Sequence, residues 1–187
     1  MKRPVLAFRW LLLLSLSSLS NVVGCADESA PITGLTFDAC ASLDIGIAPS
    51  VTAEQMQGVS DALAMWNQAA GTALAPMTTD AGPGSTAFST STPMVPLTFQ
   101  VAAPPFHGLY DDRAGRIYVN ADLTDVAPLR ITIAHEIGHA FGLPHVSASV
   151  RSSLMNTGNT TVGITPEDVD ALAAIWGRCA PAPTSSP

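Results

Sequence analysis

Residues 135–145 constrain this chain more than any others, because their spacing fixes how side chains can meet around one metal ion. They read HEIGHAFGLPH, the pattern H-E-x-x-H-x-x-G-x-x-H. His135 and His139 are four residues apart, so on a helix both imidazoles lie on one face and can bind the same ion. Glu136 lies about 100° further round the helix, where it can reach a water on the metal without binding the metal itself. The spacing therefore predicts a metal site with an acid–base group beside it.

Gly142 and His145 complete the predicted site. A glycine takes the left-handed conformation that ends a helix at little cost, and the chain can then turn and bring His145 in as a third ligand. Three protein ligands leave the fourth tetrahedral position open, which is typical of catalytic rather than structural zinc. A chance match to five fixed positions has a probability below about one in a million per position. The predicted ligands of one Zn²⁺ are thus His135, His139 and His145. Glu136 is the predicted general base.

The N-terminus has the composition of an export signal. Lys2, Arg3 and Arg9 form a positively charged region, and the apolar run 10–19 that follows is too short to cross a membrane. We expect residues 1–24 to be a signal peptide that is removed from the mature protein.

The end of this segment resembles the lipobox of bacterial lipoproteins. The sequence VVGC ends at Cys25, which is the position that is lipidated after cleavage in such proteins. Several acyl chains anchor a protein stably, whereas a single chain is marginal. Ala26, not Asp, follows the cysteine, so the resemblance implies anchoring to a bacterial outer membrane, on its periplasmic or surface face. The alternative is plain secretion after cleavage near Gly24 or Ala26.

The other two cysteines lie near the ends of the folded region. If Cys25 carries lipid, Cys40 and Cys179 remain, and we predict a disulfide between them because the protein is exported. Such a bond closes a loop of roughly 140 residues and contributes about 5 kcal/mol in the loop-entropy model. The alternative is two free, buried thiols.

Composition places one globular domain between a tether and a tail. We predict a tether at 25–36, a single catalytic domain at 37–180 and a disordered tail at 181–187, which is rich in Pro, Ser and Thr. The formal net charge is −7 at pH 7 and the sequence has no basic patch, so nucleic acid is not expected as a partner. We expect a monomer.

Capping residues and periodicity predict the elements around the motif. Thr52 begins a capping box, and Gly71 ends the amphipathic helix that follows it. Asp125 is expected to cap the motif helix. Thr165 caps a last helix that Gly177 ends. Strands are predicted at 43–48, 74–78, 97–101, 106–111 and 116–120.

Two further features extend the pattern toward the C-terminus. Met155 lies ten residues beyond His145, and the last helix begins with the adjacent acids Glu167 and Asp168. Together with the zinc motif, this arrangement resembles the metzincin metallopeptidases, and within them most closely the matrixins, the matrix-metalloproteinase type. The resemblance implies an α+β fold with a twisted, mixed five-stranded sheet, an antiparallel edge strand and three helices.

The resemblance also implies roles for residues outside the motif. Met155 would lie beneath the zinc ligands in a tight turn, and Asp168 would support the backbone of that turn. The edge strand would pair with an extended peptide substrate. The uncharged stretch 156–164 would wall the pocket for the residue after the scissile bond. The chain is thus expected to be a zinc endopeptidase in which Glu136 takes a proton from the attacking water and passes it to the leaving amine.

The chain also departs from the matrixin pattern. Val146 stands where the family usually has Ser after the third histidine, and Tyr118 stands at a strand position expected to supply a ligand for a second zinc. His107 is the one histidine outside the motif, so we predict a surface or cleft residue there and no second zinc. Calcium lacks support in the sequence, because its candidate ligands are scattered turn acids, namely Asp111, Asp112 and Asp122.

Two other functions fit the same motif. One is a catalytically silent, lipid-anchored zinc-binding module that keeps the fold and the metal, although an intact Glu136 argues against it. The other is a structural zinc protein, which needs a fourth protein ligand, and no obvious His or Cys is available for that role.

Overall fold

The structure is a computed structural model, and it describes residues 31–79 and 92–180. The signal segment, Cys25 with its predicted lipid and the tail 181–187 lie outside the described residues, so the predictions for them stay predictions. No helix within the described ranges is long and apolar enough to cross a membrane.

One mixed sheet of five strands forms a layer of the molecule. Its strands are β1 (Ser42–Ile47), β2 (Ala73–Thr78), β3 (Met94–Gln100), β4 (Gly108–Asp111) and β5 (Arg116–Asn120). Their order is β2-β1-β3-β5-β4. The pairs β1–β2, β1–β3 and β3–β5 are parallel, and only the edge strand β4 is antiparallel to its neighbour. Along the inner strand β1 the buried side chains of Leu43, Ile45 and Ile47 come at every second residue, as expected for a strand with one face toward covering helices.

Strand β3 begins three residues earlier than the sequence predicts. Pro96 lacks a backbone N–H, and proline is typical of strand edges and strand starts. In the structure β3 pairs with β1 from Met94 onwards, whereas its pairing with β5 begins only at Leu97. Pro96 therefore lies where β3 has a neighbour on one side only, and the strand accommodates it there.

Three helices begin and end at the predicted caps. They are α1 (Ala53–Ala70), α2 (Val126–Ala140) and α3 (Pro166–Trp176). Thr52 and Gln55 form a reciprocal capping box before α1, and Gly71 ends this helix with φ 70°. Thr165 and Asp168 form the same kind of box before α3. These side chains satisfy terminal backbone groups that have no partner within the helix.

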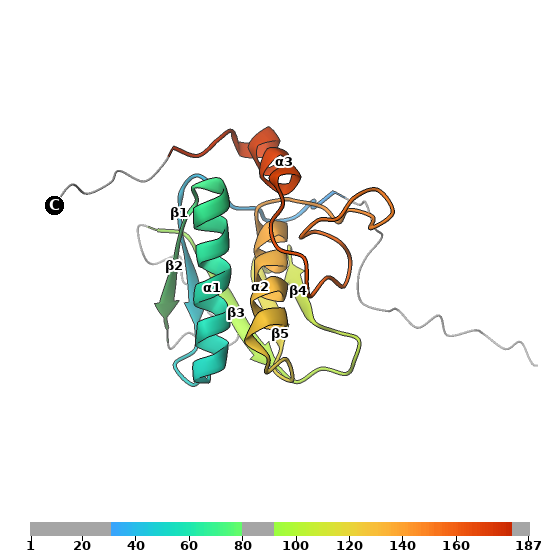
Figure 1. The fold of residues 1–187 in the computed structure, drawn as a ribbon. Helices are drawn as coiled ribbons and strands as arrows, with labels where there is room; N and C mark the ends of the chain where they lie inside the picture. Colours follow the sequence, from blue (N-terminus) through green and yellow to red (C-terminus); the bar gives the residue numbers. More distant parts are fainter. Residues whose placement is uncertain (1–30, 80–91, 181–187) are drawn as a thin grey trace, which may run out of the picture.

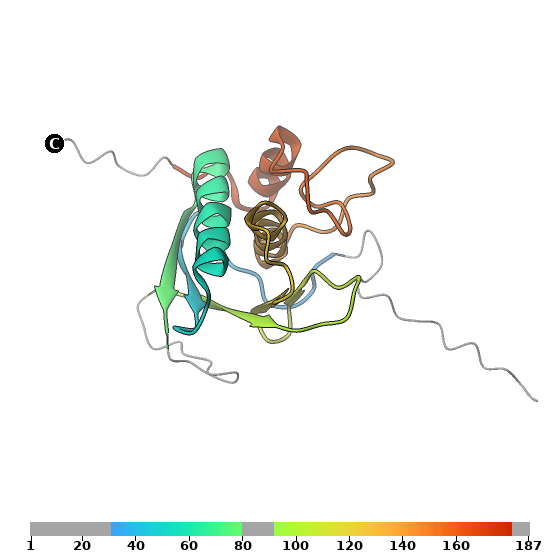
Figure 2. The ribbon, with the colours of Figure 1, turned by 60° about the horizontal axis from the view of Figure 1, so that its bottom comes forward.

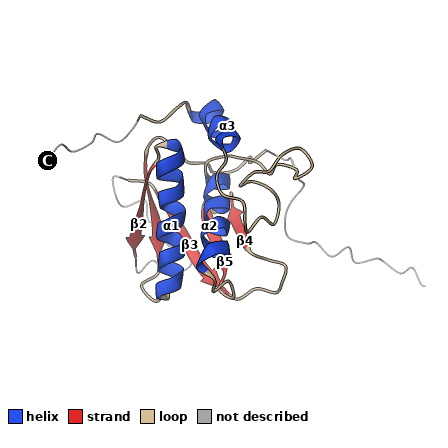
Figure 3. Ribbon diagram, viewed as in Figure 1, coloured by secondary structure: helices blue, strands red, loops and turns tan. Residues whose placement is uncertain are grey.

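Helices α1 and α2 lie side by side on one face of the sheet (Figure 1, Figure 2), and α3 lies across one end of this helix layer (Figure 3). Trp66 on α1 is fully buried, donates its indole N–H to Ala134 O of α2 at 2.9 Å, and meets the Phe141 ring edge-on. Trp176 on α3 donates its indole N–H to Phe141 O at 2.8 Å. Two tryptophans thus fix α1 and α3 against the helix that carries the zinc motif.

Helix α2 forms the centre of the apolar core. It is buried over 11 of its 15 residues, which include Ile133 and Ile137 on the side toward the core. Burying one aliphatic side chain of this size contributes about 1.5–3 kcal/mol. The polar residues of the motif are therefore held by a helix that the core fixes in place. The predicted α+β fold, with its mixed five-stranded sheet, antiparallel edge strand and three helices, is confirmed.

The segment before β1 contacts the far end of β4 and the end of α2. Leu35 N–H donates to Asp112 O at 2.6 Å, and Leu35 O accepts from the Tyr110 hydroxyl at 2.7 Å. Phe37 N–H donates to Ala140 O at 2.9 Å. The last residues of the stretch that the sequence assigns to a tether thus pack on the domain.

A disulfide joins the two ends of the domain. It links Cys40, just before β1, to Cys179, just after α3, across 139 positions of sequence. The pairing is the one that the cysteine count indicates.

Candidate metal centre

Helix α2 presents two of the predicted ligands on one face. His135 and His139 are 5% and 7% exposed, and their rings meet edge-on with centroids 4.8 Å apart. The four-residue spacing brings both rings to the same side of the helix. Buried imidazoles need hydrogen-bond partners or a metal, because burying a polar group without either is costly.

The chain turns sharply at the end of α2. Phe141 is the C-cap, and Gly142 follows with φ 92°, in the left-handed region that favours glycine. Gly142 N–H donates to His139 O at 2.8 Å, and Leu143 N–H donates to Gly138 O at 2.9 Å. This turn reverses the chain, so the segment that follows returns along the helix and carries the third imidazole of the motif to the other two.

The three imidazoles converge through their Nε2 atoms. Nε2 of His145 lies 3.1 Å from Nε2 of His139 and 3.2 Å from Nε2 of His135. In a tetrahedral site with Zn–N bonds of 2.0–2.1 Å, ligand nitrogens lie about 3.3 Å apart. The two distances from His145 match this value, and all three ligand atoms lie within 4.8 Å of one another, so the group could hold one metal ion. No other cluster of His, Cys, Asp and Glu in the described ranges has ligand atoms close enough to hold a metal.

Backbone carbonyls orient two of the rings. His135 Nδ1 lies 2.7 Å from Leu154 O, and His139 Nδ1 lies 2.7 Å from Leu143 O. A carbonyl only accepts, so each Nδ1 carries the proton and each Nε2 keeps its lone pair for a metal. Burial lowers the pKa of His135 to about 4 and the pKa of His139 to about 3 in the metal-free site. Both rings are therefore neutral at neutral pH, which is the form that binds zinc.

Glu136 occupies a buried position beside the predicted ligands. Its side chain is buried, and this burial raises the pKa of Glu136 to about 8, while a hydrogen bond from the Tyr110 backbone acts in the opposite direction. Gly108 on β4 leaves room for the carboxyl group, since a Cβ at that position would lie 2.8 Å from Glu136 Oε1. A carboxyl group with a pKa near neutrality, next to three converging imidazoles, is suited to general acid–base catalysis.

Met155 packs against the ligand helix. It is fully buried, and a Cβ built on Gly138 would lie 2.5 Å from Met155 Sδ, so the glycine allows the turn to approach α2 closely. Met155 O accepts from Val146 N–H at 2.9 Å. The turn is thereby bonded to the residue that follows the third histidine, although that residue is not the Ser usual in matrixins.

Asp168 at the start of α3 supports the turn that contains Met155. Its Oδ2 accepts from Leu154 N–H at 2.9 Å, and its Oδ1 accepts from the Ser153 hydroxyl. Since Leu154 O accepts from His135 Nδ1, a single residue connects the carboxylate to a metal ligand. Burial opposes the negative charge, but the hydrogen bonds from Ser153, Thr165 and Leu154 outweigh it and hold the pKa of Asp168 below its ordinary value.

Arg151 gives this buried carboxylate a positively charged partner. Its Nη1 lies 3.1 Å from Asp168 Oδ1, and its side chain is 26% exposed. The sequence places Arg151 only as a residue that could enter the pocket for the residue after the scissile bond, and it did not indicate that Arg151 or Ser153 contacts Asp168, because neither lies at a motif position. Their contacts depend on the path of the loop between the third histidine and α3, and no local pattern in the sequence encodes that path.

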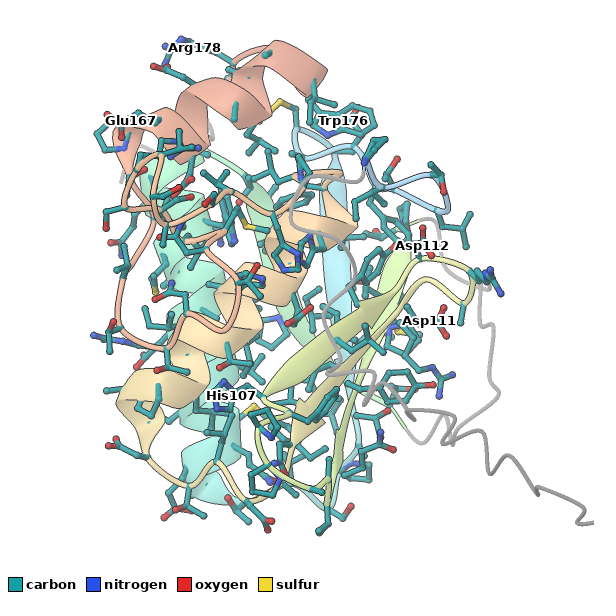
Figure 4. The ribbon with its side chains drawn as sticks, turned by 90° about the vertical axis from the view of Figure 1, so that its right-hand side faces the viewer. His107, Asp111, Asp112, Glu167, Trp176 and Arg178 are labelled. Carbon is teal, nitrogen blue, oxygen red and sulfur yellow. A yellow bond between two sulfur atoms is a disulfide. The ribbon has the colours of Figure 1, made fainter. Side chains whose placement is uncertain are left out.

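The histidine outside the motif and two of the acids considered as calcium ligands lie at opposite ends of β4. His107 lies beside α2, where it lines a small pocket together with Glu136 (Figure 4). Asp111 and Asp112 lie at the other end, in the hairpin turn, and their side chains accept hydrogen bonds from backbone N–H groups. The prediction of a surface or cleft position for His107 agrees with its place, and calcium remains without support.

No protein-family model matches the chain, and no curated protein matches it. Solved structures do match. Archaemetzincin from Methanopyrus kandleri aligns with a TM-score of 0.55 and 14% identity, over 77% of this chain and 100% of that one. Myroilysin aligns with a TM-score of 0.50 and 13% identity, over 81% of this chain and 90% of that one. At these identities the likeness shows a shared fold, and one of the two proteins is by name a metzincin.

Proposed function

We propose that the chain is a zinc-dependent endopeptidase with Glu136 as its general base. The observation that carries the proposal is the convergence of three imidazole Nε2 atoms beside a buried carboxyl group. The fold shared with archaemetzincin and myroilysin supports this class of reaction. The metal fits because three Nε2 atoms converge, and because the ring orientation and the neutral state of His135 and His139 suit Zn²⁺.

The residues of the chain provide the proton transfers. A zinc ion held by the three histidines supplies Lewis acidity and lowers the pKa of water toward 7. Glu136 takes one proton from the attacking water as the C–O bond forms, and it returns this proton to the leaving nitrogen as the C–N bond breaks. One water is consumed, and Glu136 ends in its starting state.

The open edge of β4 offers a place for an extended peptide. At the start of the hairpin with β5, His107 O accepts from Asn120 N–H at 2.8 Å. In the antiparallel register Leu109 lies opposite Tyr118 and forms the next hydrogen-bonded pair. The backbone groups of Gly108, between these pairs, therefore point away from β5. A substrate strand added at this edge would lie beside the acid of α2.

We further propose that the mature chain is an exported, lipid-anchored member of the matrixin-like metzincins. The support is in the sequence: a basic and then apolar N-terminus, the residues VVGC ending at Cys25, and Met155 with Asp168 after the zinc motif. Cys25→Ser should move the protein from the membrane fraction to the soluble fraction of the host. An unchanged membrane fraction would contradict lipidation at this cysteine.

The variant Glu136→Gln tests the proposed reaction in the mature chain. It should keep one zinc per chain, because no ligand changes, and lose at least about 10²-fold in kcat, because the base is gone. Zinc is measured by atomic absorption and cleavage by mass spectrometry of a peptide library. Glu54→Gln is the matched control, since Glu54 is an exposed residue in the first turn of α1, and this variant should cleave as the unaltered chain does.

Three outcomes separate the candidate functions. Undiminished turnover by Glu136→Gln would remove Glu136 as the base. A zinc-loaded chain that cleaves no peptide and binds no hydroxamate inhibitor would favour the silent module. A fourth protein ligand in a zinc-loaded crystal structure would identify a structural zinc site.

A further inference from the structure

A small pocket opens beside Glu136, and His135 forms part of its wall. Its cavity volume is about 30 Å³, which is room for two or three water-sized groups, since one such group needs roughly 10–15 Å³. Helix α2, the start of β4 and the loop before α3 all contribute to its walls, and His107 lies at the β4 side (Figure 4). The walls include His107, Gly108, Thr132, Glu136, Gly158 and Asn159.

Two polar side chains of this pocket, Thr132 and His107, make no hydrogen bond within the described ranges. Thr132 lies one turn before Glu136 and is 2% exposed, and its hydroxyl oxygen is the one buried side-chain polar atom in the described ranges that lacks a hydrogen-bond partner. An unsatisfied buried hydroxyl is destabilising unless a ligand or water completes it. In the structure the Thr132 methyl group faces Gly108. Threonine in a helix populates two χ1 rotamers, and rotation about χ1 can bring the hydroxyl to the position that this methyl group takes.

Asn159, another polar residue of the pocket, is already engaged in hydrogen bonds. Its Nδ2 donates to Leu154 O at 3.0 Å and to Val162 O at 2.7 Å, and its Oδ1 accepts from Thr161 N–H and Val162 N–H. Leu154 O also accepts from His135 Nδ1. Asn159 therefore forms a fixed wall that is connected to a metal ligand, and the recognition of a ligand is left to the other two residues.

Size and charge restrict what the pocket can hold. A Cβ at Gly108 would lie 2.8 Å from both Glu136 Oε1 and Thr132 Cγ2, so the walls approach closely on this side. Aromatic and long aliphatic side chains exceed the volume. Glu136 disfavours an anionic side chain beside it, and the pocket has no second carboxylate to pair with a Lys or Arg of the substrate.

We propose that this pocket receives a short, uncharged, hydrogen-bonding side chain of the substrate, namely Ser, Thr or Asn, at a position next to the scissile bond. Thr132 and His107 are then specificity-determining residues that bond to this side chain. The inference rests on the proposed peptidase function, because it is that function that brings a peptide beside Glu136. It names the substrate class that the sequence alone does not indicate.

Isosteric peptide pairs test the inference with the zinc-loaded mature chain. The peptides are identical except for Thr or Val, and for Asn or Leu, first directly after and then directly before the scissile bond. We expect kcat/KM to be at least about fivefold higher for the hydroxyl or amide member at one of the two positions, as one or two hydrogen bonds would give. Equal rates, or a preference for Val and Leu, at both positions would overturn the inference.

Two variants connect the preference to the pocket. Thr132→Val removes the hydroxyl at constant shape, and His107→Leu removes the ring nitrogens. The readout is the ratio of the two peptides within each variant, so a general loss of activity cancels. Loss of the preference in either variant supports the inference and identifies the residue that bonds to the side chain, whereas a full preference in both overturns it. Thr161→Val, at an exposed threonine of the adjacent loop, should keep the original ratio.

A binding measurement separates this inference from the proposed function. Calorimetry with the Glu136→Gln chain and the same peptides needs no turnover. If the unaltered chain cleaves none of the peptides, the peptidase proposal fails. Even then, tighter binding of the Thr peptide than of the Val peptide, if Thr132→Val abolishes it, would support the proposed specificity of the pocket. Equal binding of the two peptides would overturn that proposal as well.

Discussion

At the scale of single residues, the carboxyl group of Glu136 links zinc binding to pH. Burial raises the pKa of Glu136 to about 8, so in the metal-free protein this group holds a proton at pH 6.5. The positive charge of a bound zinc ion favours the carboxylate and expels the proton. His135 and His139 contribute no proton at this pH, because their pKa values of about 4 and 3 leave them neutral already.

We therefore expect zinc binding at pH 6.5 to release about one proton more from the unaltered chain than from Glu136→Gln. Calorimetry in buffers with different ionisation enthalpies measures this difference, and any contribution from His145 cancels because both chains contain it. Because zinc binding displaces this proton, the zinc affinity of the unaltered chain, relative to that of the variant, should rise with pH up to about 8 and then level off. An affinity ratio that does not change with pH would contradict the buried, protonated state of Glu136.

The buried carboxylate of Asp168 gives a second prediction at this scale. Asp168→Asn removes the negative charge that pairs with Arg151 and weakens the acceptor of the hydrogen bond from Leu154 N–H. The carbonyl group of Leu154 in turn orients the ring of His135. We expect zinc affinity to fall by about 10- to 100-fold, which is the usual effect of changing a residue that orients a metal ligand. Competition with a chromophoric chelator measures the affinity.

The matched control for this variant is Asp170→Asn on the same helix. Asp170 pairs with Arg178 at 2.8 Å, but both side chains are exposed, and neither contacts the turn that holds Met155. Zinc affinity should not change in the control. An equal loss in both variants would show that the effect comes from α3 as a whole and not from the connection to His135.

Single residues also show which parts of the site could be predicted from the sequence and which could not. His135 and His139 follow from helical spacing, because residues four apart share a face of a helix, and His145 follows from the turn expected at Gly142. The carbonyl groups of Leu143 and Leu154 do not, since every residue has a carbonyl and only the folded backbone selects which one meets an imidazole. The residues that support the site were therefore beyond prediction except for Met155 and Asp168, which the family resemblance supplied.

At the scale of elements, the helices were the most predictable part of the molecule. Thr52, Asp125 and Thr165 cap the three helices in the described ranges, and each side chain bonds to a backbone N–H within the next turn. Such interactions are local, so they are visible in the sequence. The start of β3 was less predictable, because the tolerance for Pro96 depends on where a neighbouring strand begins.

The contact between α2 and the turn that holds Met155 gives a prediction for elements. Gly138 has Met155 Sδ at 2.5 Å and Trp66 Cζ2 at 3.4 Å from the place of a Cβ. Gly138→Val should destabilise the protein by about 1–3 kcal/mol, because added methyl groups overpack a closed interface. Urea unfolding of the metal-free protein measures this change.

Gly163→Val is the control for this packing prediction. A Cβ at Gly163 would meet only the end of the Met65 side chain, at 3.5 Å, which is ordinary contact. Its stability should change much less than that of Gly138→Val. Equal changes in the two variants would indicate that the cost is a property of replacing glycine and not of the approach between α2 and the Met155 turn.

At the scale of the whole molecule, the candidate site lies where separate parts of the chain meet. Helix α2 supplies two ligands and the acid, the loop after α2 supplies the third ligand, β4 lies along the carboxyl group, and α3 supports the turn beneath the ligands. The chain between the third histidine and α3 has little regular structure of its own. Its position depends on contacts with both helices, so the geometry of the site depends on the cohesion of the whole domain.

Removal of the disulfide between Cys40 and Cys179 gives a prediction for the stability of the whole domain. The bond spans 139 positions, so it constrains nearly the whole unfolded domain, and its loss should cost about 2–5 kcal/mol. For a domain of this size the loss corresponds to a fall in Tm of roughly 5–15 °C. The double variant Cys40→Ser with Cys179→Ser should show this fall in calorimetry, and a reducing agent should lower the Tm of the unaltered chain by a similar amount without changing the variant further.

Zinc stoichiometry at 25 °C should stay at one in the variant, because neither cysteine contacts the ligands or the turn beneath them. Loss of zinc from a variant that is still folded would show that the disulfide positions α3, and through Asp168 the metal site, and does more than restrict the unfolded chain.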